Sequence, residues 1–129
     1  MIEFARKKSK PVFIAEATPT ITNPDAGQPG YTLETDLDNP QQAQKAWEEW
    51  FLPFFDTINQ NPDVVKAVSY INANWRIRPM WQSNPTFKNI DARLQQSPFI
   101  TKMWNAEISK NKFLKADSGL FKTLWVPSF

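Results

Sequence analysis

The stretch "KPVFIAEATP", Lys10 to Pro19, gives the clearest fold signal in the chain. Its segment "PVFIA" is a short continuous apolar run, which is typical of a strand that is buried on both faces. The run leads to a carboxylate, Glu16, shortly before a second proline. Since a buried strand does not usually end on an acid without a partner or a task, Glu16 is a candidate functional residue. Two structural alternatives remain open, a helix-capping acid and an ion-paired acid.

Helix and loop signals flank this stretch. Residues 2–9, "IEFARKKS", look like the last turns of a helix, because Ile2 and Ala5 share a face and the basic run suits a helix C-terminus. Residues 18–38 are rich in Pro, Gly, Thr, Asn and Asp, which indicates a loop of about twenty residues directly after Glu16.

An amphipathic helix is predicted over residues 40–59. Asn39 is able to cap it, Pro40 fits its first position, and Pro53 should kink it. Its aromatic and aliphatic stripe is expected to pack in a core rather than to bind a ligand. The stripe consists of Ala43, Trp47, Trp50, Phe51, Phe54 and Ile58.

A second strand is predicted over "VVKAVSYINANW", residues 64–75, and a last helix over "SPFITKMWNAEISKN", which Ser97 caps and Pro98 opens. Alternation divides the strand into a face of mostly small side chains, which suits the inside of a narrow barrel, and an outer face with Tyr70 under the helices. The inward face would consist of Ala67, Ser69, Ile71, Ala73 and Trp75. The tail 112–129 shows no clear period and stays unassigned.

Composition excludes several classes of chemistry. The chain has 129 residues, a formal net charge of +2, and neither Cys nor His. Disulfides, Ser-His-Asp or Cys-His catalysis and zinc sites with these ligands are therefore excluded within it. The charge is too small to argue for nucleic acid or an anionic membrane. No segment is long and apolar enough to span a membrane, and the N-terminus lacks the apolar core of a signal peptide.

Strands that alternate with helices predict an α/β fold with parallel strands and right-handed crossovers. Two parallel strands do not make a stable sheet alone. The pattern therefore indicates either an unusual small α/β domain or a piece of a larger one.

Four segments resemble a known family. "KPVFIAEATP", followed by the tryptophan-rich helix, "VKAVSYINANW" and "NIDARLQQSPFITKMWNAEI", resembles the C-terminal quarter of (β/α)8-barrel glycoside hydrolases. The likeness is strongest to family 26, which includes β-mannanases and related β-glycanases, and it covers residues 2–110. It implies that 1–129 is one partial catalytic domain, the strand 7–helix 7–strand 8–helix 8 portion of a TIM barrel.

The resemblance also implies site residues. The carboxylate that ends barrel strand 7 is the family's nucleophile, and it falls on Glu16. The tryptophan that ends strand 8 lines the sugar site, and it falls on Trp75. Barrel active sites lie at the carboxyl ends of the strands, where both residues are predicted to be. Trp81, in the following loop, is expected to form an outer sugar subsite. No metal ion and no organic cofactor are implied.

The resemblance supplies only half of the chemistry. Retaining hydrolysis needs two carboxylates about 5–5.5 Å apart, a nucleophile and an acid/base. The family's acid/base is a glutamate on strand 4, which this chain lacks, and a complete barrel takes about 250 residues. We therefore expect the chain alone to hydrolyse mannan, xylan and mixed β-glucans no faster than buffer. Met1 is expected to be an internal methionine at the end of helix 6.

The implied parent is a secreted enzyme that performs retaining endo-hydrolysis of a β-linked polysaccharide, mannan or a related β-glycan. The implied partners are that polysaccharide and the missing N-terminal part of the barrel. Two rival hypotheses stay open, a non-catalytic carbohydrate-binding or assembly fragment and an unrelated small α/β interaction protein.

Local predictions follow for the residues around this site. Val12, Ile14 and Glu16 are predicted to share the inward face of the first strand. Asp91 and Arg93 are expected to pair with each other or to cap the short helix. Arg76 and Arg78 are expected to lie in a solvated loop, with contact to substrate hydroxyls as the alternative. Trp75 is as plausible a core side chain as a sugar platform before the resemblance is considered.

Overall fold

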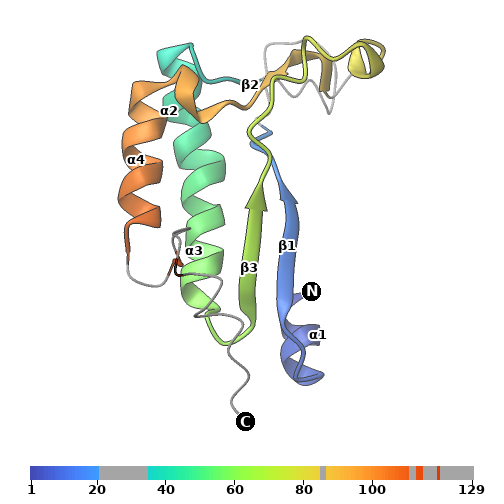
Figure 1. Cartoon of the computed structure of the whole chain (residues 1–129), viewed down its shortest axis with the longest axis vertical. Helices are drawn as coiled ribbons and strands as arrows, with labels where there is room; N and C mark the ends of the chain where they lie inside the picture. Colours follow the sequence, from blue (N-terminus) through green and yellow to red (C-terminus); the bar gives the residue numbers. More distant parts are fainter. Residues whose placement is uncertain (21–34, 85–86, 111–112, 115–118, 120–129) are drawn as a thin grey trace.

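The computed structural model describes residues 1–20, 35–84, 87–110, 113–114 and 119 (Figure 1). Along the chain the helices are α1 (Ile2–Lys7), α2 (Pro40–Ala46), a π-helical segment (Trp47–Phe51), α3 (Leu52–Gln60) and α4 (Pro98–Ile108), with 3₁₀ turns at Pro79–Trp81, Phe87–Asn89 and Leu94–Gln96. The strands are β1 (Val12–Ala17), β2 (Thr35–Asp36), β3 (Val65–Tyr70) and β4 (Ile90–Asp91).

Strands β1 and β3 pair in parallel as neighbours, which confirms the predicted strand–helix–strand unit. The connection between them includes α2 and α3, which run as one continuous rod beside the sheet, and α4 lies on the outer side of that rod (Figure 1). The described helices of this unit therefore cover one face of the two-stranded sheet.

The predicted helix over residues 40–59 is present, and its start follows the predicted chemistry. The side chain of Asn39 accepts hydrogen bonds from the backbone N–H groups of Gln41 and Gln42, at 3.0 and 3.1 Å. A π-helical turn ends two residues before Pro53, and the kink predicted at this proline stays a prediction. Pro53 has no N–H group to donate, so a wider turn ahead of it accommodates the interrupted bonding. Ser97 caps α4 through Ile100 N–H at 3.3 Å, as predicted.

Aromatic side chains form the core between the helices and the sheet. Phe51 is fully buried and contacts Trp47, Tyr70 and Trp104, with ring centroids 5.7 to 6.1 Å apart. Tyr70 of β3 lies under the helices, as predicted, and burial raises the pKa of its phenol, with the charge of Asp91 adding to the effect. The stripe of the long helix is therefore core packing.

The opposite face of the sheet is open, which corrects the prediction that the first strand is buried on both faces. Val12 and Ile14 pack toward the helices, whereas Phe13 is 62% exposed and Ala15 is also exposed. The apolar run predicted two covered faces, but among the described residues only one helical layer is present to cover the sheet.

The second strand is shorter than predicted. It ends at Tyr70 rather than at residue 75, and the predicted inward face therefore does not continue as far as Trp75. The chain beyond it instead forms a second, small sheet, in which β2 and β4 pair in parallel. Trp75 N–H donates to the carbonyl of Ile90 at 3.0 Å, and Asn74 forms an antiparallel bridge with Asp91. Among the described residues no helix is long and apolar enough to cross a membrane.

Candidate functional site

Glu16 lies at the carboxyl end of β1, and an irregularity in the strand determines where it points. Ile14 is opposite Val68 and Ala17 is opposite Tyr70, so β1 carries one more residue than β3 between these two pairs. Ile14, Val68 and Tyr70 all pack toward the helical core. Because the extra residue shifts the alternation, Ala17 rather than Glu16 is in step with the core-facing side chains. Ala17 is buried and Glu16 is exposed.

The prediction that Val12, Ile14 and Glu16 share one face is wrong, because of this bulge. Val12 and Ile14 face the helices, and Glu16 lies with Phe13 and Ala15 on the open side of the sheet. A regular strand would have turned the carboxylate toward the apolar core, where an unpaired charge is costly. The described contacts include no ion pair and no cap formed by the Glu16 side chain, so neither structural alternative is supported among the residues that the structure describes.

Glu16 lies near the carboxyl end of β1 and Trp75 follows the carboxyl end of β3, and because the two strands are parallel these ends lie together (Figure 1). Trp75 lies five residues beyond the end of β3, in the loop that leads to β4. Its indole Nε1 is buried and has no hydrogen-bond partner among the described atoms. That Glu16 and Trp75 act on one substrate stays a prediction.

Trp81 belongs to the same aromatic cluster, which consists of Trp75, Trp81 and Phe87. The ring of Trp81 lies 5.7 Å from that of Trp75 at 77°, and 4.9 Å from that of Phe87. Trp75 and Phe87 are 5.2 Å apart. Trp81 is therefore partly buried, and its predicted role as an outer sugar subsite stays a prediction. All three rings keep some exposed surface, and each supports its neighbours.

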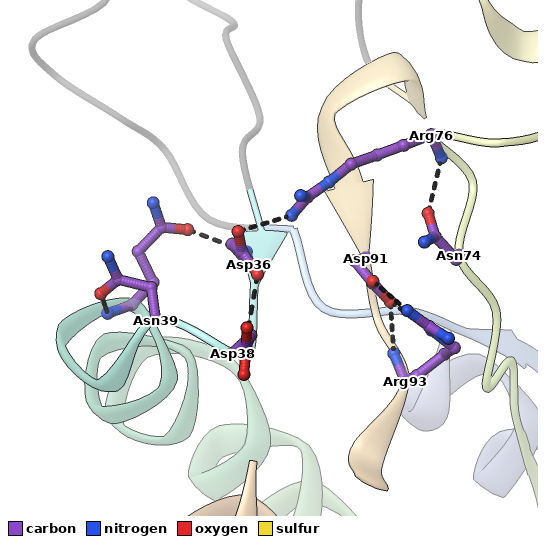
Figure 2. Close-up of polar contacts among 8 residues, drawn as sticks. Asp36, Asp38, Asn39, Asn74, Arg76, Asp91 and Arg93 are labelled. Atoms are coloured by element: carbon purple, nitrogen blue, oxygen red, sulfur yellow. Dashed lines mark hydrogen bonds and ion pairs between the residues drawn. The ribbon is translucent and has the colours of Figure 1, made fainter. Parts of the chain in front are cut away.

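A polar cluster surrounds the backbone of this loop (Figure 2). Arg93 donates from Nε and an Nη atom to the two carboxylate oxygens of Asp91, at 2.9 and 2.7 Å, which confirms the predicted pair. Desolvation alone would raise the pKa of Asp91, but the hydrogen bonds and charge of Arg93 outweigh it, and the pKa is lowered. Arg76 is not a solvated side chain, because it forms an ion pair with Asp36 at 3.1 Å. Arg78 is exposed, as predicted.

The loop side chains of two asparagines have structural tasks. Asn74 Oδ1 accepts from the backbone N–H of Arg76 at 3.0 Å. Asn72 Oδ1 accepts from Leu94 N–H at 2.8 Å, and its amide donates to Gln95 at 3.1 Å. The two bonds of Asn72 connect the segment after β3 to the segment before α4.

The arrangement offers an exposed carboxylate at the carboxyl end of β1 and a set of aromatic rings in the chain that follows β3. Within the described residues no group of three metal-ligating side chains is present. Chemically, an exposed carboxylate is able to act as a nucleophile or a base, and aromatic rings are able to stack on sugar faces. Phe87, Asp36 and the β2–β4 sheet were not predicted from the sequence, because two-residue strands leave no alternating pattern.

Comparison with known proteins identifies two relatives. The chain is 32% identical over 127 residues to "Beta-1,3-xylanase TXYA" from a Vibrio species, and 31% identical over 127 residues to a "Beta-1,3-xylanase" from an Alcaligenes species. The chain is related to glycoside hydrolases. In both alignments 95% of the chain is covered, but it spans only 27% and 26% of the relatives' own lengths. No family model matches the chain.

Proposed function

We propose that the chain is part of a retaining glycoside hydrolase that cleaves β-1,3-linked xylan. The observation that carries the proposal is the position of Glu16, an exposed carboxylate that a strand bulge turns to the open face at the carboxyl end of a parallel sheet. This is where the nucleophile of a barrel glycosidase belongs. The relationship to two enzymes named β-1,3-xylanase favours that polysaccharide over the mannan expected from the family resemblance.

In this mechanism Glu16 attacks the anomeric carbon of the sugar, and the bond to the leaving oxygen breaks. The covalent glycosyl-enzyme intermediate is then hydrolysed by water. A second carboxylic acid protonates the leaving oxygen, and in this proposal it belongs to another part of the barrel. Trp75 stacks on the sugar next to the bond that is cleaved. The rings of Trp81 and Phe87 hold the indole of Trp75 in place.

We further propose that β1, the long helix, β3 and α4 are the strand 7–helix 7–strand 8–helix 8 portion of a (β/α)8 barrel. Three features of the described residues support this. Strands β1 and β3 are parallel, the face of their sheet opposite the helices is open, and no further strand pairs with either of them among the described residues. An apolar groove of about 430 Å³ also runs beside β3, lined in part by Val65, Val68 and Phe113. In a barrel, the next strand would pair with β3 and cover this groove. We propose that this strand belongs to the rest of the barrel.

The test is a chimera in which the chain replaces the corresponding segment of the Vibrio β-1,3-xylanase. The chimera should hydrolyse β-1,3-xylan in preference to β-1,4-mannan, with retention at the anomeric carbon followed by proton NMR. Glu16→Gln should abolish activity, while Asp56→Asn, which changes an exposed carboxylate on α3, should not. An active chimera that tolerates Glu16→Gln would refute the proposed role. An active chimera that prefers mannan would refute the substrate.

The rival hypothesis, a non-catalytic carbohydrate-binding fragment, uses the same aromatic rings without Glu16. It predicts that the isolated chain binds xylo-oligosaccharides and that Trp75→Ala weakens binding while Glu16→Gln does not. The aromatic cluster is the specific observation that favours it.

A further inference from the structure

The position of Trp75 depends on the small β2–β4 sheet rather than on the main sheet. Two backbone hydrogen bonds connect its loop to β4, from Trp75 N–H to Ile90 and from Ala92 N–H to Ala73, both at 3.0 Å. The residue before Trp75, Asn74, forms a bridge with Asp91. A displacement of β4 would therefore move the indole.

Strand β4 is in turn fixed to β2, where two aspartates are direct neighbours. Asp36 and Asp91 are cross-strand partners, so their side chains leave the sheet on the same side. Adjacent like charges destabilise a strand pair. Here each carboxylate has its own guanidinium, Arg76 at 3.1 Å from Asp36 and Arg93 at 2.7 Å from Asp91 (Figure 2).

Arg76 differs from Arg93 in what it connects. Arg93 is two residues from its partner in the sequence, whereas Arg76 joins the loop after β3 to the segment just before α2. Asp36 N–H donates to the side chain of Gln42 in α2 at 2.8 Å, so the ion pair reaches the start of that helix. Arg76 also directly follows Trp75, and its N–H donates to Asn74.

We propose that Arg76 is a positioning residue for Trp75. Its ion pair with Asp36 fixes the loop that carries Trp75. The indole, as the proposed sugar platform, is thereby held in a fixed position relative to the amino end of α2. The sugar-binding part rests on the function proposed above. Arg76 touches no substrate in this account. Its effect passes through the β2–β4 sheet to the aromatic cluster, and the ion pair links β2 to the loop that follows β3.

The charge arrangement makes a specific prediction of coupling. Arg76→Met removes one guanidinium and leaves the two adjacent carboxylates with one of their two described guanidinium partners, that of Arg93. Asp36→Asn removes one of the carboxylates, so the damage from Arg76→Met should be smaller in that background. A residue that merely fills space would give the same effect in both backgrounds.

The first measurement is near-ultraviolet circular dichroism of the full chain, which reports the Trp75–Trp81 pair 5.7 Å apart. The signal of this pair is assigned as the difference between wild type and Trp75→Phe. Arg76→Met should reduce it by more than half, Arg76→Lys should retain most of it, and Asp36→Asn with Arg76→Met should recover part of it. Arg6→Met is the matched control, because it removes an ion pair between α1 and Asp63, just before β3, at the other end of the strand pair, and should leave the signal unchanged.

The second measurement is titration of the same variants, made in the chimera with the Vibrio β-1,3-xylanase, with β-1,3-xylotriose, followed by tryptophan fluorescence. Arg76→Met should weaken binding roughly two- to fivefold, the range expected from loss of a partly exposed ion pair, and Arg6→Met should not change it. A dichroism signal that is insensitive to Arg76→Met, in a chain that remains folded, would overturn the positioning role. If wild type and variants bind no sugar while the dichroism changes as stated, the positioning role holds and the proposed function fails.

Discussion

Phe13→Ser distinguishes a free-standing domain from a piece of a barrel. Phe13 is on the open face of the sheet and is 62% exposed. In the isolated chain the substitution removes little buried surface, and the free energy of unfolding should change by less than about 0.5 kcal/mol. Val12→Ala is the matched control one residue away. Val12 is only 8% exposed, and truncating it should cost about 2 kcal/mol.

In an assembled barrel the same phenylalanine would be covered. A phenylalanine offers about 200 Å² of surface, and burying the 62% that is exposed here, at about 25 cal/mol per Å², contributes about 3 kcal/mol. Phe13→Ser should therefore weaken association with the rest of a barrel roughly a hundredfold.

The assay has two parts. Urea unfolding of the isolated variants, followed by far-ultraviolet circular dichroism, gives the first set of free energies. Titration with the portion of the Vibrio β-1,3-xylanase that the chain does not cover gives the second. If Phe13→Ser destabilises the isolated chain as much as Val12→Ala, the open face is covered within the chain itself. If it leaves association unchanged, that face is not the inside of a barrel.

Three further predictions concern the described contacts. Asn39→Ala removes two capping bonds from α2 and should lower the free energy of unfolding by about 1 kcal/mol in urea titration, whereas Asp38→Ala should not; equal effects would contradict the capping role. The pKa of Asp91 is lowered in the folded chain. The ionised carboxylate therefore stabilises the fold at pH values above its unfolded-state pKa of about 3.9, and this stabilisation is lost as the pH falls through the lower folded-state pKa. Thermal unfolding should therefore show wild type more stable than Asp91→Asn at pH 6 and the two converging toward pH 3, and a constant difference would contradict this. Phe51→Ala, at a fully buried position, should cost about 3–5 kcal/mol in the same assay, and a cost near that of an exposed site would refute the packing described here.

The pattern of the sequence was sufficient for the long elements and insufficient for local irregularities. Asn39, Pro40, Ser97 and Pro98 define helix starts because capping depends on a few adjacent residues. The bulge before Ala17 was missed because nothing in "IAEA" distinguishes an extra residue from regular alternation. It is set by pairing with β3, a contact distant in sequence.

The site was predicted in part for the same reason. The resemblance predicted Glu16 and Trp75 as site residues, and the parallel pairing puts the carboxyl ends of β1 and β3 together. The contacts of Trp81 with Trp75 and Phe87 were not predicted, because they depend on how a loop folds. The ion pair between Arg76 and Asp36 joins residues forty positions apart, and no local pattern indicates it.

Covalent trapping tests the central claim, that Glu16 is the nucleophile of a retaining glycosidase. A retaining enzyme that is treated with an activated 2-deoxy-2-fluoro-xylo-oligosaccharide accumulates its glycosyl-enzyme intermediate. The chimera with the Vibrio enzyme would be inactivated in this way, digested and analysed by mass spectrometry. We predict that the sugar is attached to Glu16 and that Glu16→Gln takes up none. A label on another carboxylate, or an active chimera that is never labelled, would contradict the account.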